Sequence, residues 1–100
     1  MTKFTDFKTF NQYIGVSTPK NEHIDVGQYP DTTLLHSDGI AIDFYRVSFK
    51  TNYITPELPD YDPNNPKPIT AVFFNSPGNI YEWDLTEKFE GYYLHLSKEL

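Results

Sequence analysis

Cysteine is absent from the 100 residues of this chain, and its absence excludes disulfide bonds, cysteine-ligated zinc and thiol chemistry together. Long apolar runs are also missing, since none approaches the ~18 residues that a membrane-spanning helix requires. The first residues lack the charged and then apolar pattern of a signal peptide. We therefore expect a cytoplasmic protein that makes no contact with a membrane.

Basic residues are scarce as well. Eight Lys and Arg stand against 14 Asp and Glu, which gives a net charge of −6 and a pI near 4.8. An acidic chain repels phosphate backbones, so we do not expect it to bind nucleic acid directly. Its five glycines never occur as Gly-x-Gly, and this removes the glycine-rich nucleotide-binding fingerprints.

Aromatic and turn-forming residues are abundant instead. Eight Tyr, eight Phe and one Trp make up 17% of the chain, and eight prolines are spread along it. This composition favours strands, and 100 residues suffice for one domain with a single modest core. Short apolar segments between turn signals, without a βαβ rhythm, predict an all-β sandwich or barrel. We expect its strands at residues 24–30, 40–53, 69–75, 80–85 and 91–97.

The residues before the first predicted strand have a different pattern. Phe4, Phe7, Phe10 and Ile14 recur every three or four positions, which is typical of a short amphipathic helix or a docked arm. We therefore divide the chain into an N-terminal arm at residues 1–23 and a β domain at residues 24–100.

Three of the later segments carry specific expectations. In residues 40–53 the apolar side changes near Tyr45, which predicts a bulge or a strand covered on both faces. Residues 56–68 hold five prolines and predict a loop, either a lid or partner contact or a solvated excursion. In residues 91–97, the apolar face passes through Tyr92, so we expect His95 to point away from the core.

A turn of particular chemistry joins residues 69–75 to residues 80–85. Pro77 restricts φ and Gly78 permits a positive φ, the combination that favours a type II turn. Shortly after this turn comes Tyr81, which we expect at the mouth of whatever the strands enclose.

Three segments carry a family likeness. They are Asp-Phe-Tyr-Arg-Val at residues 43–47, Phe-Phe-Asn-Ser-Pro-Gly-Asn-Ile-Tyr-Glu-Trp at residues 73–83 and Glu-Gly-Tyr-Tyr-Leu at residues 90–94. In order and spacing, this part of the chain resembles the N-terminal cupin-like sensor domain of AraC-type bacterial transcription regulators. The resemblance implies a cupin-like double-stranded β-helix, or jelly-roll, barrel over residues 24–100. It also implies that helices and a helix-turn-helix DNA-binding domain, absent from this chain, belong to the complete regulator.

The same resemblance bears on metal binding. Cupins that hold a metal carry a His-x-His pair on the early strand and a His after the Pro-Gly turn, and these positions fall on Ile40, Ile42 and Tyr81. A transition metal needs imidazole, carboxylate or thiolate donors. The chain's histidines, His23, His36 and His95, are never paired at ligand spacing. We therefore expect neither a metal nor another cofactor.

The predicted ligand site is the aromatic-lined interior of the barrel. Rings with hydroxyl tips suit a small organic ligand such as a sugar or an aromatic compound; the alternative is that the rings simply fill the barrel. A surface position is the default for an unpaired Arg46, but an inward Arg46 would anchor a carboxylate bidentately. The expected ligand-binding residues are Tyr45, Arg46, Phe74, Tyr81, Trp83 and Tyr92.

These expectations lead to one functional hypothesis and two alternatives. The first is an effector-sensing regulatory domain of a bacterial transcription regulator, with no catalytic activity, in which a ligand stabilises one arrangement of the arm. Its partners would be a small-molecule effector, DNA through the missing C-terminal domain, and, as an open question, a second copy of itself. The alternatives are a metal-dependent cupin enzyme (an isomerase or dioxygenase) and a carbohydrate-binding or structural β-sandwich.

Overall fold

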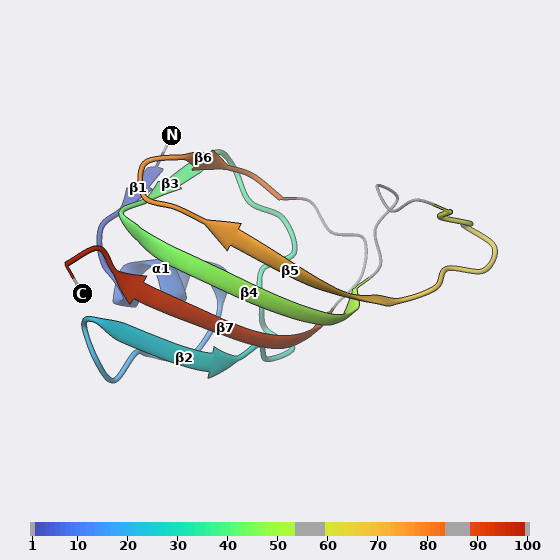
Figure 1. The fold of residues 1–100 in the computed structure, drawn as a ribbon, viewed down its shortest axis with the longest axis horizontal. Helices are drawn as coiled ribbons and strands as arrows, with labels where there is room; N and C mark the ends of the chain where they lie inside the picture. Colours follow the sequence, from blue (N-terminus) through green and yellow to red (C-terminus); the bar gives the residue numbers. More distant parts are fainter. Residues whose placement is uncertain (1, 54–59, 84–88, 100) are drawn as a thin grey trace.

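The computed structural model describes residues 2–53, 60–83 and 89–99. Within them the chain is mainly β, as predicted, with two sheets and one short N-terminal helix (Figure 1). In chain order the elements are β1 (Thr2–Phe4), α1 (Phe7–Ile14), β2 (Ile24–Gln28), β3 (Ile40–Ile42), β4 (Phe44–Tyr53), β5 (Ile69–Asn75), β6 (Ile80–Tyr81) and β7 (Glu90–Ser97).

The two sheets differ in size and pairing. The larger sheet has the strand order β2-β7-β4-β5 and is antiparallel throughout. In the smaller sheet, β3 lies between β1 and β6, and β1 runs parallel to it. The described strands form two separate sheets and do not close into a barrel, so the cupin-like barrel remains a proposal.

The chain passes between the sheets at two adjacent places. Only Asp43 separates β3 of the smaller sheet from β4 of the larger one. The turn after β5 leads into β6, and there Gly78 has the positive φ, 85°, that the predicted turn requires. Because the backbone N–H of Gly78 donates to the carbonyl of Ile42 over 2.9 Å, the two crossings are joined directly.

The predicted N-terminal helix is present as α1. Asp6 caps its start by accepting a hydrogen bond from the Thr9 backbone N–H at 2.8 Å, and Gly15 ends it with a φ of 80°. Its apolar stripe, predicted from the spacing of the phenylalanines, packs on the inner side of the sheets. The buried core comprises Phe4, Phe7, Phe10, Ile14, Ile40, Ile42 and Phe44.

The expected orientation of His95 is wrong. Its side chain is completely buried, and Tyr93 shares its inward face, whereas Tyr92 on the opposite face is 56% exposed. The apolar residues of β7, Tyr92, Leu94 and Leu96, lie on its outer face, so their alternation pointed to the wrong side as the inner one. The polarity of His95 is compensated by partners from β2 and β4, which the local sequence does not show.

The outer face of the larger sheet is apolar. Register places Val26, Leu94, Val47 and Phe74 in one row across all four strands. Seven members of this face are exposed, Val26 by 67% and Phe74 by 64%. The outer apolar face consists of Ile24, Val26, Tyr45, Val47, Phe49, Val72, Phe74, Tyr92, Leu94 and Leu96.

Other predicted segments are shorter or only partly described. The strand expected at 80–85 is the two-residue β6, and residues 84 and 85 lie outside the described part of the chain. The predicted loop at 56–68 is described from residue 60 onward, where it contains neither helix nor strand. No described helix is long and apolar enough to cross a membrane.

Gly91 supplies a test of the sheet register. It has a φ of 144°, and a Cβ placed on it would overlap the carbonyl oxygen of Phe49 on the neighbouring strand. We expect Gly91→Ala to lower the free energy of unfolding by at least about 2 kcal/mol. At Gly39 the nearest atom to an added Cβ is a methyl group of Ile80, 3.9 Å away. Gly39→Ala should therefore change the free energy of unfolding by less than about 0.5 kcal/mol. Urea denaturation of both variants measures this difference; equal losses would contradict it.

Candidate functional site

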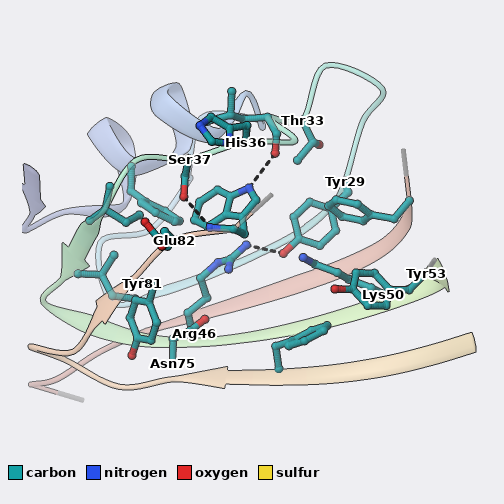
Figure 2. Close-up of a pocket in the computed structure, with 17 residues that line it drawn as sticks. Tyr29, Thr33, His36, Ser37, Arg46, Lys50, Tyr53, Asn75, Tyr81 and Glu82 are labelled. Atoms are coloured by element: carbon teal, nitrogen blue, oxygen red, sulfur yellow. Dashed lines mark hydrogen bonds between the residues drawn. The ribbon is translucent and has the colours of Figure 1, made fainter. Parts of the chain in front are cut away.

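A cavity of about 430 Å³ lies between the larger sheet and the layer that covers its inner face (Figure 2). Its floor comes from β4 and β5, and its other walls come from α1, residues 29–37, β3 and residues 81–83. Most of the lining side chains are aromatic or aliphatic. Two cations, Arg46 and Lys50, project into it from alternate inward positions of β4.

Arg46 is buried at the cavity wall, contrary to the surface position expected by default. Its side chain is held in place because Nε donates to Nε2 of His95 at 3.3 Å and Nη2 donates to the hydroxyl of Tyr29 at 2.6 Å. The guanidinium also lies over three rings, with 5.4 Å to the centroid of Phe10 and 6.0 Å to those of Tyr29 and Trp83. Such cation–π contacts further favour this position.

Behind Arg46 a buried chain of hydrogen bonds leads to helix α1. Since Nε2 of His95 accepts from Arg46, the ring proton is assigned to Nδ1, which donates to Oδ2 of Asp25 at 3.0 Å. The same carboxylate oxygen accepts from Nδ2 of Asn11 at 2.8 Å, and Nδ2 also donates to the carbonyl of Ser17 at 3.0 Å. All four linked side chains are at least 90% buried.

Burial determines the charge of His95. It lowers the pKa of the imidazole from 6.5 to about 4, and the positive charge of Arg46 acts in the same direction, while Asp25 opposes both. At neutral pH the ring is therefore uncharged. Its contact with Asp25 is then a hydrogen bond of a neutral imidazole and not an ion pair.

Lys50 occupies a cage of rings at the other end of the cavity. Its Nζ lies 4.4 Å from the ring centroid of Phe89, 5.0 Å from that of Phe73 and 5.6 Å from that of Tyr53. Burial lowers the pKa of this ammonium to about 8, with a further contribution from the charge of Arg46. Lys50 thus still carries its positive charge at neutral pH.

Trp83 lines the cavity and is held by hydrogen bonds to the chain at residues 34–37. Its indole Nε1 donates to the carbonyl of Leu34 at 3.1 Å. Its backbone N–H donates to the hydroxyl of Ser37 at 3.0 Å, and the Ser37 N–H donates to the Trp83 carbonyl at 2.8 Å. The indole is therefore fixed as one wall of the site.

Of the six predicted ligand-binding residues, three line the cavity and three lie on the outer apolar face of the larger sheet. Arg46, Tyr81 and Trp83 line the cavity. Tyr45, Phe74 and Tyr92 do not, because they belong to the outer apolar face of the larger sheet.

The positions that the family resemblance assigns to metal ligands are also brought together. Ile40, Ile42 and Tyr81 all line the cavity, and Ile40 pairs with Tyr81 in the smaller sheet. The hydroxyl of Tyr81 is turned to the adjacent turn, where it accepts from the Ser76 N–H and donates to the Ser76 carbonyl. Within the described ranges, no three His, Cys, Asp or Glu side chains converge in a way that would hold a metal ion.

Sequence reasoning missed Lys50, Tyr29 and the buried partners of Arg46. One signal was present: Arg46, Ser48 and Lys50 alternate in phase with Phe44, so a buried Phe44 places all three on the inner face. Tyr29 gave no such signal. It lies beyond the end of β2, and only the fold brings its hydroxyl to 2.5 Å from the hydroxyl of Ser48.

Comparison of the chain with protein-family models, with curated proteins and with solved structures finds no match. The functional argument therefore depends on the cavity and its chemistry.

We expect His95 to make stability depend on pH. Its pKa is about 4 in the folded chain against 6.5 when unperturbed, so between these values only the unfolded state binds the proton. Above pH 6.5 the ring is neutral in both states, and the free energy of unfolding is at its full value with respect to this group. As the pH falls, proton binding to the unfolded state lowers the free energy of unfolding, by about 3 kcal/mol at pH 4.

The His95→Gln variant provides the control, because its amide can accept from Arg46 but does not titrate. Urea denaturation of both proteins between pH 7.5 and 4 should show that the stability advantage of the wild type shrinks toward low pH. If the two curves run parallel, His95 is not buried as a neutral ring.

Proposed function

We propose that this chain is the effector-sensing domain of an AraC-type transcription regulator, which binds a small organic ligand in the cavity and does not transform it. The observation that carries the proposal is the cavity itself, at about 430 Å³ and lined by rings and two cations. Small-molecule sites typically measure about 300–1,000 Å³ and combine apolar walls with a few placed polar groups.

The fold is compatible with this proposal. Both sheets and helix α1 contribute residues to the wall of the cavity. We interpret the larger and smaller sheets as the two halves of a cupin-like jelly roll. The metal-dependent cupin enzyme is the weaker alternative, because Ile40 and Ile42 offer hydrocarbon where such an enzyme needs metal ligands.

The hydrogen-bonded chain behind Arg46 suggests how occupancy would be transmitted. A ligand that contacts Arg46 acts on a side chain connected through His95 and Asp25 to Asn11 of helix α1. Such a ligand shifts the N-terminal segment only if it binds one arrangement of this chain more tightly than the other. In the complete regulator, DNA binding would depend on this shift in the arrangement of the N-terminal segment.

Filling the cavity should weaken ligand binding. Asn75→Phe adds a ring to a residue that lines the cavity, whereas Val72→Phe adds the same ring on the outer face of the same strand. Trp83 is the chain's single tryptophan and lines the cavity, so its fluorescence reports on occupancy. With a panel of sugars, aromatic alcohols and organic acids, we expect saturable quenching in the wild type and Val72→Phe, and at least tenfold weaker binding in Asn75→Phe.

A compound selected in this way should also slow hydrogen exchange in α1. The expected change is several-fold greater protection of the α1 amides at saturation. Exchange over residues 2–20 that is the same with and without the compound would contradict the sensing role, even if the compound binds.

We further propose that two copies associate through the outer apolar face. A fully exposed residue of this size offers roughly 150–200 Å² of surface, so the seven exposed members provide on the order of 700 Å². Each partner in a standard interface contributes about 800 Å². An uncharged face is complementary to its own copy, and two such sheets would stack face to face about 10 Å apart.

Sedimentation velocity tests this association. Phe74→Lys places a charge on the outer apolar face, and we expect it to weaken a dimer at least tenfold, since a buried, unpaired ammonium is strongly unfavourable. Ile80→Lys is the matched control: Ile80 is equally exposed, at 63%, but lies on β6 of the smaller sheet. A wild type that stays monomeric at high concentration, or equal effects of both substitutions, would refute the proposal.

A further inference from the structure

The cavity holds two buried cations from one strand. Arg46 and Lys50 are each only 8% exposed, and the charge of one contributes to lowering the pKa of the other. Among the described residues, no carboxylate forms a salt bridge with either, although Glu82 lies on the cavity wall. This concentration of positive charge is notable in a chain with a net charge of −6.

From this juxtaposition we propose that the ligand is an organic anion, namely a carboxylate with an aromatic or aliphatic body. The inference rests on the proposed function and names the chemical class that this cavity selects. Buried charges are normally paired, because moving an unpaired charge out of water is costly. A bound carboxylate would supply the direct negative partner that no described carboxylate gives to either cation.

Arg46 has the donors that such a ligand needs. A guanidinium carries five N–H groups, and among the described residues the hydrogen bonds to His95 and Tyr29 use two of them, which leaves three for a ligand. These include both hydrogens of Nη1 and one of Nη2, the pair of nitrogens that receives a carboxylate bidentately. The contacts of Arg46 with His95 and Tyr29 hold this end of the side chain toward the cavity in advance of binding.

Lys50 provides the second positive charge, and its N–H donors have no fixed direction. It is surrounded by the rings of Phe73, Tyr53 and Phe89, and its ammonium donors are mobile about a flexible side chain. The other walls of the cavity are mainly rings and aliphatic groups, among them Trp83 and Ile40. The anionic end of a ligand would therefore bind at Arg46, and its apolar body would pack against these walls.

The test compares three compounds of nearly the same shape and different charge: benzoate, benzamide and benzylamine. Binding is followed by Trp83 fluorescence in a phosphate-free buffer at pH 7, with sucrose and phenol as neutral probes of the cavity. We expect benzoate to bind at least about tenfold more tightly than benzamide, since charge-assisted hydrogen bonds are roughly twice as strong as neutral ones. Benzylamine should bind most weakly.

Variants identify the source of this preference. Lys50→Met retains a long apolar side chain in the ring cage and should reduce the preference for benzoate several-fold, and Arg46→Met should abolish it. Lys98→Met removes an equal charge from the surface, where Lys98 pairs with Asp43, and should leave the preference unchanged. Near-UV circular dichroism establishes whether Arg46→Met is folded; if it is not, Lys50→Met decides.

The outcomes separate this inference from the function on which it rests. If benzamide or the neutral probes bind as tightly as benzoate, the cavity is a ligand site but the anion inference is wrong. The same conclusion follows if Lys50→Met and Lys98→Met have equal effects. If none of the charged or neutral compounds alters Trp83 fluorescence up to their solubility limits, both the inference and the proposed function fail.

Discussion

The buried hydrogen bond between Arg46 and His95 connects the parts of this molecule that matter for its function. It joins β4 to β7 inside the larger sheet, and it continues through Asp25 on β2 to Asn11 on helix α1. A guanidinium with so little exposure is tolerated because neutral imidazole, phenol hydroxyl and three ring faces surround it. The cavity has a cationic wall because of this arrangement, and the helix is connected to that wall by the same contacts.

Two crossings of the chain between the sheets give the site its shape. At Asp43 one strand of the smaller sheet becomes one strand of the larger sheet, and at Gly78 the chain returns. The hydrogen bond from Gly78 to Ile42 holds the crossings together at one end of the cavity. The buried core and the cavity adjoin beside these crossings, since Ile40 and Ile42 belong to both.

Local patterns in the sequence predicted the elements well where one periodicity prevailed. The spacing of Phe4, Phe7, Phe10 and Ile14 predicted a short helix or a docked arm; the last three lie on α1, whereas Phe4 ends β1. Pro77 with Gly78 predicted the turn before β6. The patterns failed for the direction of His95, because Tyr92, Leu94 and Leu96 make the outer face of β7 the apolar one, and the polar partners that allow His95 to be buried come from other strands. The burial of Arg46 was missed for the same reason, since Tyr29 and His95 lie 17 and 49 residues away in the chain.

The distribution of polarity across the larger sheet is the reverse of the usual one. Its inner side carries Arg46, Ser48, Lys50, Asp25 and His95, while its outer side carries valine, leucine, isoleucine and aromatic residues. Apart from hydrophobic attraction, the force that acts between two such outer faces is repulsion between like net charges of −6. Salt screens that repulsion over about 10 Å at 0.1 M ionic strength and leaves the attraction in place. Self-association of this chain should consequently be weakest in dilute buffer and increase as salt is added. An assembly held by ion pairs would show the opposite dependence on salt.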